Sequence, residues 1–142
     1  MKISKKCEYA IYAIIDLCQQ PENSAVPISD ISRRKNIPMP FLEQIMLILK
    51  SGGIVKSRRG SSGGFTLNRT PDQITMGQVL KLIDGPVTPV SVQHDHVTMP
   101  EDIILGEIWN SISTAVNKVI NNVTFAELVR RIKESHEYNY II

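Results

Sequence analysis

The fold of this chain is decided by residues 27–67, which read PISDISRRKNIPMPFLEQIMLILKSGGIVKSRRGSSGGFTL. Two helical patterns, Ile28–Lys35 and Pro40–Lys50, are separated by a short link with a proline in it. Apolar residues recur in the second pattern at a spacing of three and four, which predicts one buried face. These residues are Phe41, Leu42, Ile45, Met46 and Leu49. The opposite face carries Glu43, Gln44, Leu47 and Lys50, a mixed polar surface that suits a DNA major groove.

A glycine-rich hairpin follows the helix pair. Two short β-prone runs, Ile54–Arg59 and Phe65–Leu67, flank the loop Gly60–Gly64, which predicts a two-stranded hairpin with arginines at its tip. The glycines do not indicate a phosphate-binding P-loop, because no lysine and helix follow them. A helix pair followed by a basic hairpin is typical of a winged helix-turn-helix, so we predict a DNA-binding protein with a wing.

Length, charge and composition agree with this prediction. The 142 residues allow one domain and an additional element. Residues 1–69 hold eleven Lys and Arg against five Asp and Glu, whereas residues 70–142 hold five against nine. A basic first half and an acidic second half indicate a DNA reader joined to an assembly or sensing part.

We expect a cytoplasmic protein that does not bind membranes, since no signal pattern or membrane-spanning run is present. No Ser/His/Asp or Cys/His set indicates an enzyme.

Basic residues outside the wing are candidates for phosphate contacts. Lys2, Lys5 and Lys6 precede or open a helix that runs to about Gln19 and would position the protein without reading sequence. Arg33 and Arg34 suit either a phosphate or the dipole of their own helix, and the two roles are compatible. Cys7 and Cys18 lie in the first helical pattern and imply no structural disulfide. Packing is favoured for Cys18, while Cys7 is either packed or redox-active, since neighbouring lysines can lower a thiol pKa.

The second half predicts three further helices. Residues 68–72 are expected to form a turn, and Thr75–Gln78 has the form of a capping box that starts a helix ended by Gly85. After a proline-punctuated linker, a long helix is predicted over Glu101–Asn121, and Thr124–Glu127 opens a last helix. The long helix has an apolar face too broad for a small domain to cover, so a symmetric dimer is expected. The expected dimer contacts are Leu105, Ile108, Trp109, Ile112, Val116 and Val119.

The predicted fold is therefore mainly α, with a winged helix-turn-helix, a two-stranded wing and a long C-terminal dimerisation helix. We expect a DNA-binding domain over residues 1–85, and a linker or effector loop over residues 86–100. Residues 101–142 then form the dimerisation helix, the last helix and a tail.

Four segments carry a family resemblance: Met1–Ser4 with Tyr9-Ala10, Phe41–Ile45, Gly53–Ser57, and the wing from Arg59 to Phe65. Together they resemble the Rrf-two family of bacterial transcription regulators over nearly the whole chain. The resemblance implies a winged-helix homodimer on a palindromic DNA operator, with Glu43 and Gln44 in the major groove and Arg59 in the minor groove. The full set of expected DNA contacts is Lys2, Lys5, Lys6, Arg33, Arg34, Pro40, Phe41, Glu43, Gln44, Arg58, Arg59, Gly60 and Ser61.

The linker departs from one branch of the family. IscR-like members hold an iron–sulfur cluster on three linker cysteines, whereas this linker offers His94, Asp95 and His96 and no cysteine. Because such clusters need thiolates, we expect no iron–sulfur cluster and no other cofactor. The weak metal candidates are Glu8, Cys7, His94 and His96, and a solvated loop is favoured for the two histidines.

The cysteine-free linker and residues 85–90 look instead like the CymR-like branch. Members of that branch repress cysteine and sulfur-source genes together with cysteine synthase. That enzyme captures a peptide ending in isoleucine, which Tyr140, Ile141 and Ile142 resemble. Packing of these residues against the dimer helix is an equal alternative. The resemblance thus implies a homodimeric repressor of sulfur and cysteine metabolism; the alternative is a regulator that responds to a cluster, a metal or redox state through unconventional ligands.

Overall fold

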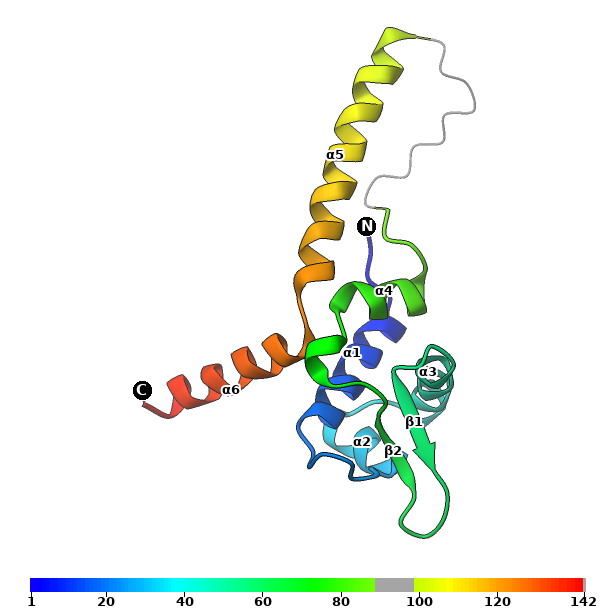
Figure 1. Cartoon of the computed structure of the whole chain (residues 1–142), viewed down its shortest axis with the longest axis vertical. Helices are drawn as coiled ribbons and strands as arrows, with labels where there is room; N and C mark the ends of the chain where they lie inside the picture. The colour runs from blue at the N-terminus through cyan, green and yellow to red at the C-terminus, as the bar shows by residue number, and fades with distance from the viewer. Residues whose placement is uncertain (89–98, 142) are drawn as a thin grey trace.

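The computed structural model of the chain describes residues 1–88 and 99–141. A body of short helices carries a β-hairpin at one end, and one long helix projects from the opposite end (Figure 1). In chain order the elements are α1 Lys5–Cys18, α2 Ile28–Lys35, α3 Met39–Ser51, β1 Val55–Arg58, β2 Gly64–Leu67, the 3₁₀ turn η1 Pro71–Gln73, α4 Met76–Asp84, α5 Pro100–Asn122 and α6 Phe125–Ile141. The predicted mainly helical fold with a two-stranded wing is confirmed. None of the helices within the described ranges combines the length and apolarity needed to span a bilayer.

The helix pair has the bounds that the sequence predicts to within one residue. Asn36 ends α2 in the left-handed conformation with φ 53°, which asparagine tolerates better than most residues. Pro38 caps α3, and Pro40 lies in its first turn, where no backbone N–H is required.

The wing is an antiparallel hairpin in which Val55 pairs with Leu67 and Arg58 pairs with Gly64. Strand β2 is held to the body by a bridge between Val26 and Phe65, whose N–H and C=O groups exchange hydrogen bonds of 2.8 Å. Gly64 is required at this point: a Cβ there would lie 2.3 Å from the Val26 carbonyl carbon, and its φ is +154°. The docking of the wing therefore depends on one glycine.

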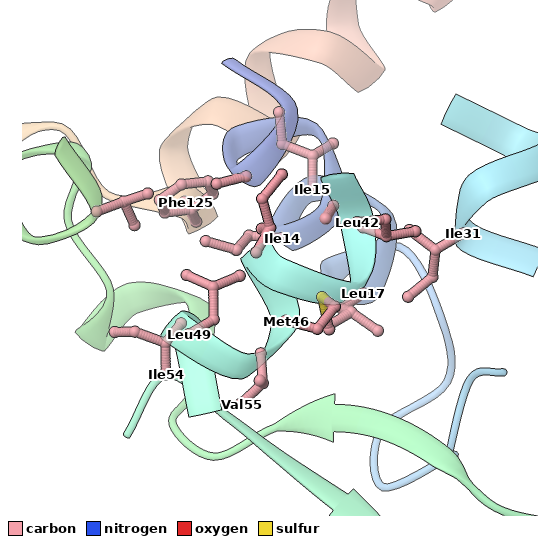
Figure 2. Packing of buried hydrophobic residues seen from close by; sticks show 14 of the residues in the cluster. Ile14, Ile15, Leu17, Ile31, Leu42, Met46, Leu49, Ile54, Val55 and Phe125 are labelled. Atoms are coloured by element: carbon pink, nitrogen blue, oxygen red, sulfur yellow. The ribbon is translucent and has the colours of Figure 1, made fainter. Parts of the chain in front are cut away.

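The hydrophobic core lies between α1, α2 and α3 and extends to the start of α6 (Figure 2). Ile14, Leu42, Met46 and Leu49 are fully buried, and Phe125 brings the first residue of α6 into the same cluster. Phe41 differs from the predicted buried face, since its side chain is 51% exposed. It lies at the edge of the buried face, next to fully buried Leu42, with its ring 6.2 Å from the ring of Tyr9.

A hydrogen-bonded joint connects the helical body to α5. Met76 donates its N–H to Val123 O at 2.8 Å and Phe125 donates to Ile74 O at 2.9 Å, so the α5–α6 corner is hydrogen-bonded to the start of α4. Gly77 lies directly beneath α5, where a Cβ would approach Asn121 Oδ1 to 1.9 Å. The orientation of α5 is therefore set by backbone contacts.

Local signals predicted the start and end of α4 correctly. Thr75 and Gln78 form the predicted capping box, with bonds of 3.2 and 3.1 Å, and Gly85 ends the helix at φ 85°.

Two other segments differ from expectation. The segment predicted as a turn over residues 68–72 runs into the 3₁₀ turn η1, which begins at Pro71, and α6 continues as a helix to Ile141 instead of ending in a tail. Thr124 caps α6 at Glu127 N, but the Glu127 carboxylate bonds Arg130 and Arg131 rather than completing a capping box.

Candidate nucleic-acid interface

The outward face of α3 is mainly polar. Glu43, Gln44 and Lys50 are exposed because the opposite face of the helix packs into the core. Leu47 lies among them and is 64% exposed. A helix whose exposed face carries an amide, a carboxylate and one apolar side chain has the groups that recognise adenine, cytosine and the thymine methyl. The sequence placed Glu43 and Gln44 on this face.

The wing tip presents a compact basic turn. Arg58, Arg59, Gly60 and Ser61 are all exposed, and the turn is closed by Gly63 N–H donating to Gly60 O at 3.0 Å. Gly60 has φ +109°, a conformation that glycine adopts readily. Arg58 reaches back to Asn23 O at 3.4 Å, which leaves Arg59 as the arginine at the tip.

The N-terminal end of α1 lies beside the N-terminal end of α3. Lys5 Nζ lies 5.1 Å from the centre of the Tyr9 ring, and that ring lies 6.2 Å from the ring of Phe41. Positive charge from α1 is thereby brought next to the first turn of α3. Lys2 and Arg33 are exposed, and Lys6 is half-buried.

Arg34 has a structural partner that the sequence did not reveal. Its Nε and Nη2 each donate to an oxygen of Asp16 at 2.9 Å, and Asp16 is only 1% exposed. Hydrogen bonding to Asp16 raises the pKa of Arg34 further above its usual range. The pair joins α2 to α1, so Arg34 satisfies a buried carboxylate, and its expected phosphate contact remains a proposal. The sequence signal for this buried ion pair is an aspartate between the apolar residues Ile15 and Leu17.

The two thiols are packed within the body. Cys7 is fully buried, and burial, with a smaller effect of the Asp84 charge, raises its pKa to about 12. Cys18 is half-buried, and burial raises its pKa to about 11. Lys5 and Lys6 therefore do not lower the Cys7 pKa, because burial of the thiol outweighs any effect of the two neighbouring charges.

The weak metal candidates are not gathered in the described part of the chain. Glu8 accepts from Tyr12 Oη at 3.0 Å and pairs with Lys5 at 3.5 Å. Within residues 1–88 and 99–141, no three His, Cys, Asp or Glu side chains converge on a possible ion position. His94 and His96 lie outside the described residues.

The predicted dimer face of α5 is uncovered. Leu105, Ile108, Ile112 and Val119 are between 39% and 62% exposed, while Trp109 and Val116 are half-buried. No residue of this 23-residue helix is buried in the single chain. A contiguous apolar surface of this kind marks a protein–protein interface.

The end of α6 is the remaining predicted site. Tyr140 and Ile141 belong to the helix, and Tyr138 one turn earlier is 65% exposed. Ile142 lies outside the described residues.

Together, an exposed reading helix, a basic wing and flanking lysines define a winged helix-turn-helix DNA-binding protein. Residues 3–131 match the model of the Rrf2 family, described as an iron-dependent transcriptional regulator. The chain belongs to the Rrf2 family of transcription regulators, and it is not an enzyme.

Named relatives come from both branches considered above. The chain is 34% identical to the HTH-type transcriptional regulator CymR of Bacillus subtilis over 128 residues, which cover 90% of this chain and 89% of that protein. It is 32% identical to IscR of Erwinia tasmaniensis over 130 residues, covering 91% and 79%. The solved structure of CymR, the global cysteine regulator of B. subtilis, superposes with a TM-score of 0.81 at 31% identity, covering 92% of this chain and 98% of that one. Such similar identities do not decide which genes this chain regulates.

Proposed function

We propose that this regulator is a homodimer that binds a palindromic operator, with α3 of each protomer in a major groove and each wing against the neighbouring minor groove. Glu43 and Gln44 would read base edges, and Arg59 would enter the minor groove. The observation that carries this proposal is the combination of an exposed polar face on α3 with an uncovered apolar face on α5.

The proposed dimer pairs the α5 helices of two copies. A two-fold dimer places the same apolar face of each protomer against the other, which covers Ile108 and its neighbours without any additional partner. Two reading helices on one operator need a spacing of about one helical turn, roughly 34 Å. The hydrogen-bonded joint between α4 and α5 supports a fixed spacing, because a loose joint would not set the distance between two reading heads.

A substitution on α5 tests the dimer. Ile108→Asp places a charge in the proposed interface and should give a monomer by light scattering, with operator affinity reduced by at least tenfold. Thr114→Asp places the same charge at an exposed position on a different side of the helix and should remain dimeric. A dimeric Ile108→Asp protein would contradict the assignment of α5.

We further propose that the protein represses genes of sulfur and cysteine metabolism by occupying promoter DNA. Two observations support this: the likeness to CymR, and a linker without the thiolates that a cluster needs. The proposed partner is cysteine synthase, which would engage the end of α6. The exposure of Tyr138 supports this proposal, because the end of α6 is then accessible to another protein.

A titration of cysteine synthase with the purified regulator tests this partner. The intact protein should bind, and a variant that lacks Ile141 and Ile142 should not. The exposed α6 variant Lys133→Ala is the control and should bind like the intact protein. Absence of binding by the intact protein would remove cysteine synthase from the proposal and leave the DNA-binding function standing.

The second candidate is a regulator that responds to a cluster, a metal or redox state. The family description and the IscR relatives favour it. The buried, protonated thiols disfavour it. Anaerobic reconstitution with iron and sulfide separates the two: the proposal predicts no visible charge-transfer absorption, whereas a stable chromophore would favour the second candidate.

A further inference from the structure

The segment before α1 is attached to the end of α4 by one carboxylate. Ser4 N–H donates to Asp84 Oδ2 at 3.0 Å, and the Ser4 hydroxyl donates to the other oxygen of the same carboxylate. Asp84 is the last residue of α4 and lies 80 positions from Ser4 in the chain.

Ser4 has a second role at the same time. Its Oγ accepts the N–H of Cys7 at 3.0 Å and thereby caps the first turn of α1, which contains Lys5 and Lys6. Met1, Lys2 and Ile3 continue from this point along Leu80 and Gly85, around a small cavity of about 110 Å³. The Asp84 carboxylate therefore anchors, at Ser4, the basic stretch Lys2–Lys6, called here the N-terminal arm.

The position of the arm matters because α1 begins beside the reading helix. The contacts from Lys5 to Tyr9 and from Tyr9 to Phe41 place the arm next to the first turn of α3. Lysines held in one place lose less conformational entropy on meeting a phosphate than lysines on a free chain end.

The residues that follow Asp84 in the chain contact α5. Val87 O accepts a hydrogen bond from Asn117 Nδ2 at 3.3 Å, so the residues just after Asp84 are attached to the proposed dimer helix. The arm and α5 are thus connected through residues 84–87 over two polar contacts.

We infer that Asp84 is a positioning residue for DNA binding: by holding Ser4, it sets the N-terminal arm against the DNA backbone and links the arm to α5. This inference rests on the proposed DNA-binding function. It gives an acidic residue a favourable role in DNA affinity, although a negative charge by itself would weaken binding to DNA.

A positioning role and a pure charge effect predict opposite changes in DNA affinity when Asp84 is removed, so one substitution separates them. Asp84→Ala and the control Asp72→Ala, an exposed aspartate on η1, each raise the net charge by one. If only charge matters, both variants bind DNA equally well or slightly more tightly than the wild type. If Asp84 positions the arm, Asp84→Ala binds on the order of fivefold more weakly, and its slope of log affinity against log salt becomes shallower by about one to two.

The probe is a duplex selected from random-sequence DNA by the wild-type protein, titrated by fluorescence anisotropy from 50 to 300 mM salt. Equal behaviour of the two variants overturns the inference and leaves the proposed function intact. Failure of the wild type to enrich any duplex overturns the proposed function and the inference with it.

A second readout does not involve DNA. Trypsin should cleave after Lys2, Lys5 or Lys6 several-fold faster in Asp84→Ala than in Asp72→Ala, while cleavage at Arg130 stays equal. Equal cleavage of the arm would contradict its attachment through Asp84. Asp84→Asn, which keeps the side-chain size, serves both measurements if the alanine variant melts early.

Discussion

At the scale of single residues, the division of labour among the arginines is the clearest result. Arg34 is held by buried Asp16, and Arg58 is held at Asn23, whereas Arg59 lies free of the body at the wing tip. The same side-chain type therefore stabilises the fold at one position and is available to DNA at another.

Arg59→Ala should weaken operator binding by at least tenfold with little change in melting temperature, because the side chain is exposed and contributes no core contact. Gel shifts and thermal melts check this together. Lys133→Ala on α6, which removes the same charge far from the wing, should bind within twofold of the wild type. Unchanged affinity of Arg59→Ala would refute the minor-groove role.

Gln44→Ala should relax the base preference at one position in each half-site. A bidentate amide contact to adenine contributes about 1–3 kcal/mol of discrimination. Binding-site selection with the variant measures this, and all other positions of the sequence logo act as the internal control. An identical logo would mean that another side of α3 faces the bases.

The thiols give a prediction that depends on pH. Burial raises the pKa of Cys7 to about 12 and that of Cys18 to about 11, so both are protonated at pH 8 in the folded state. Iodoacetamide should modify them slowly at pH 8, and rapidly once the protein is unfolded in denaturant. Since both pKa values are raised in the folded state, their contribution to stability is complete below about pH 9 and is lost progressively toward pH 12. Rapid labelling of Cys7 in the folded protein would restore a redox role.

At the scale of elements, the sequence predicted the features that depend on residues close together in the chain. The capping box at Thr75, the glycine stop at Gly85 and the bounds of the reading helices all follow from residues within a few positions of each other. The exposed positions Glu43 and Gln44 follow from helical periodicity in the same way.

What the sequence did not predict depends on contacts between distant residues. Asp16 meets Arg34 from 18 positions away, and Ser4 meets Asp84 from 80. Periodicity placed Phe41 on the buried face, but its side chain lies at the edge of that face and is 51% exposed. The burial of Cys7 likewise depends on the packing of α1 within the body, which no local pattern shows.

Gly77 tests the joint between α4 and α5. Gly77→Ala places a methyl group where Asn121 Oδ1 now lies, so the Asn121 side chain must move, and we expect α5 to shift with it away from the reading body. We expect operator affinity to fall by more than tenfold, with binding to an isolated half-site unchanged, because only the distance between the two reading heads is altered. The Gly106→Ala substitution on α5, where an added Cβ meets nothing within 4 Å, is the control. Equal loss on half-site and full operator would indicate damage to the reading body instead.

At the scale of the whole molecule, the chain is a winged-helix body and a long helix, α5, joined by a hydrogen-bonded corner. The charge asymmetry of the sequence matches this division, with basic groups around α3 and the wing, and apolar surface along α5. Neither part is sufficient alone for the proposed function, because one reading body contacts only half of a palindromic operator.

The central claim is that two copies read two half-sites through α3. It is tested most directly by selecting duplexes from random-sequence DNA with the purified wild-type protein. The account predicts an inverted repeat whose half-site centres lie about one helical turn apart, roughly 10 base pairs, bound by two chains per duplex. Enrichment of a single unpaired site bound by one chain, or of no sequence at all, would contradict it.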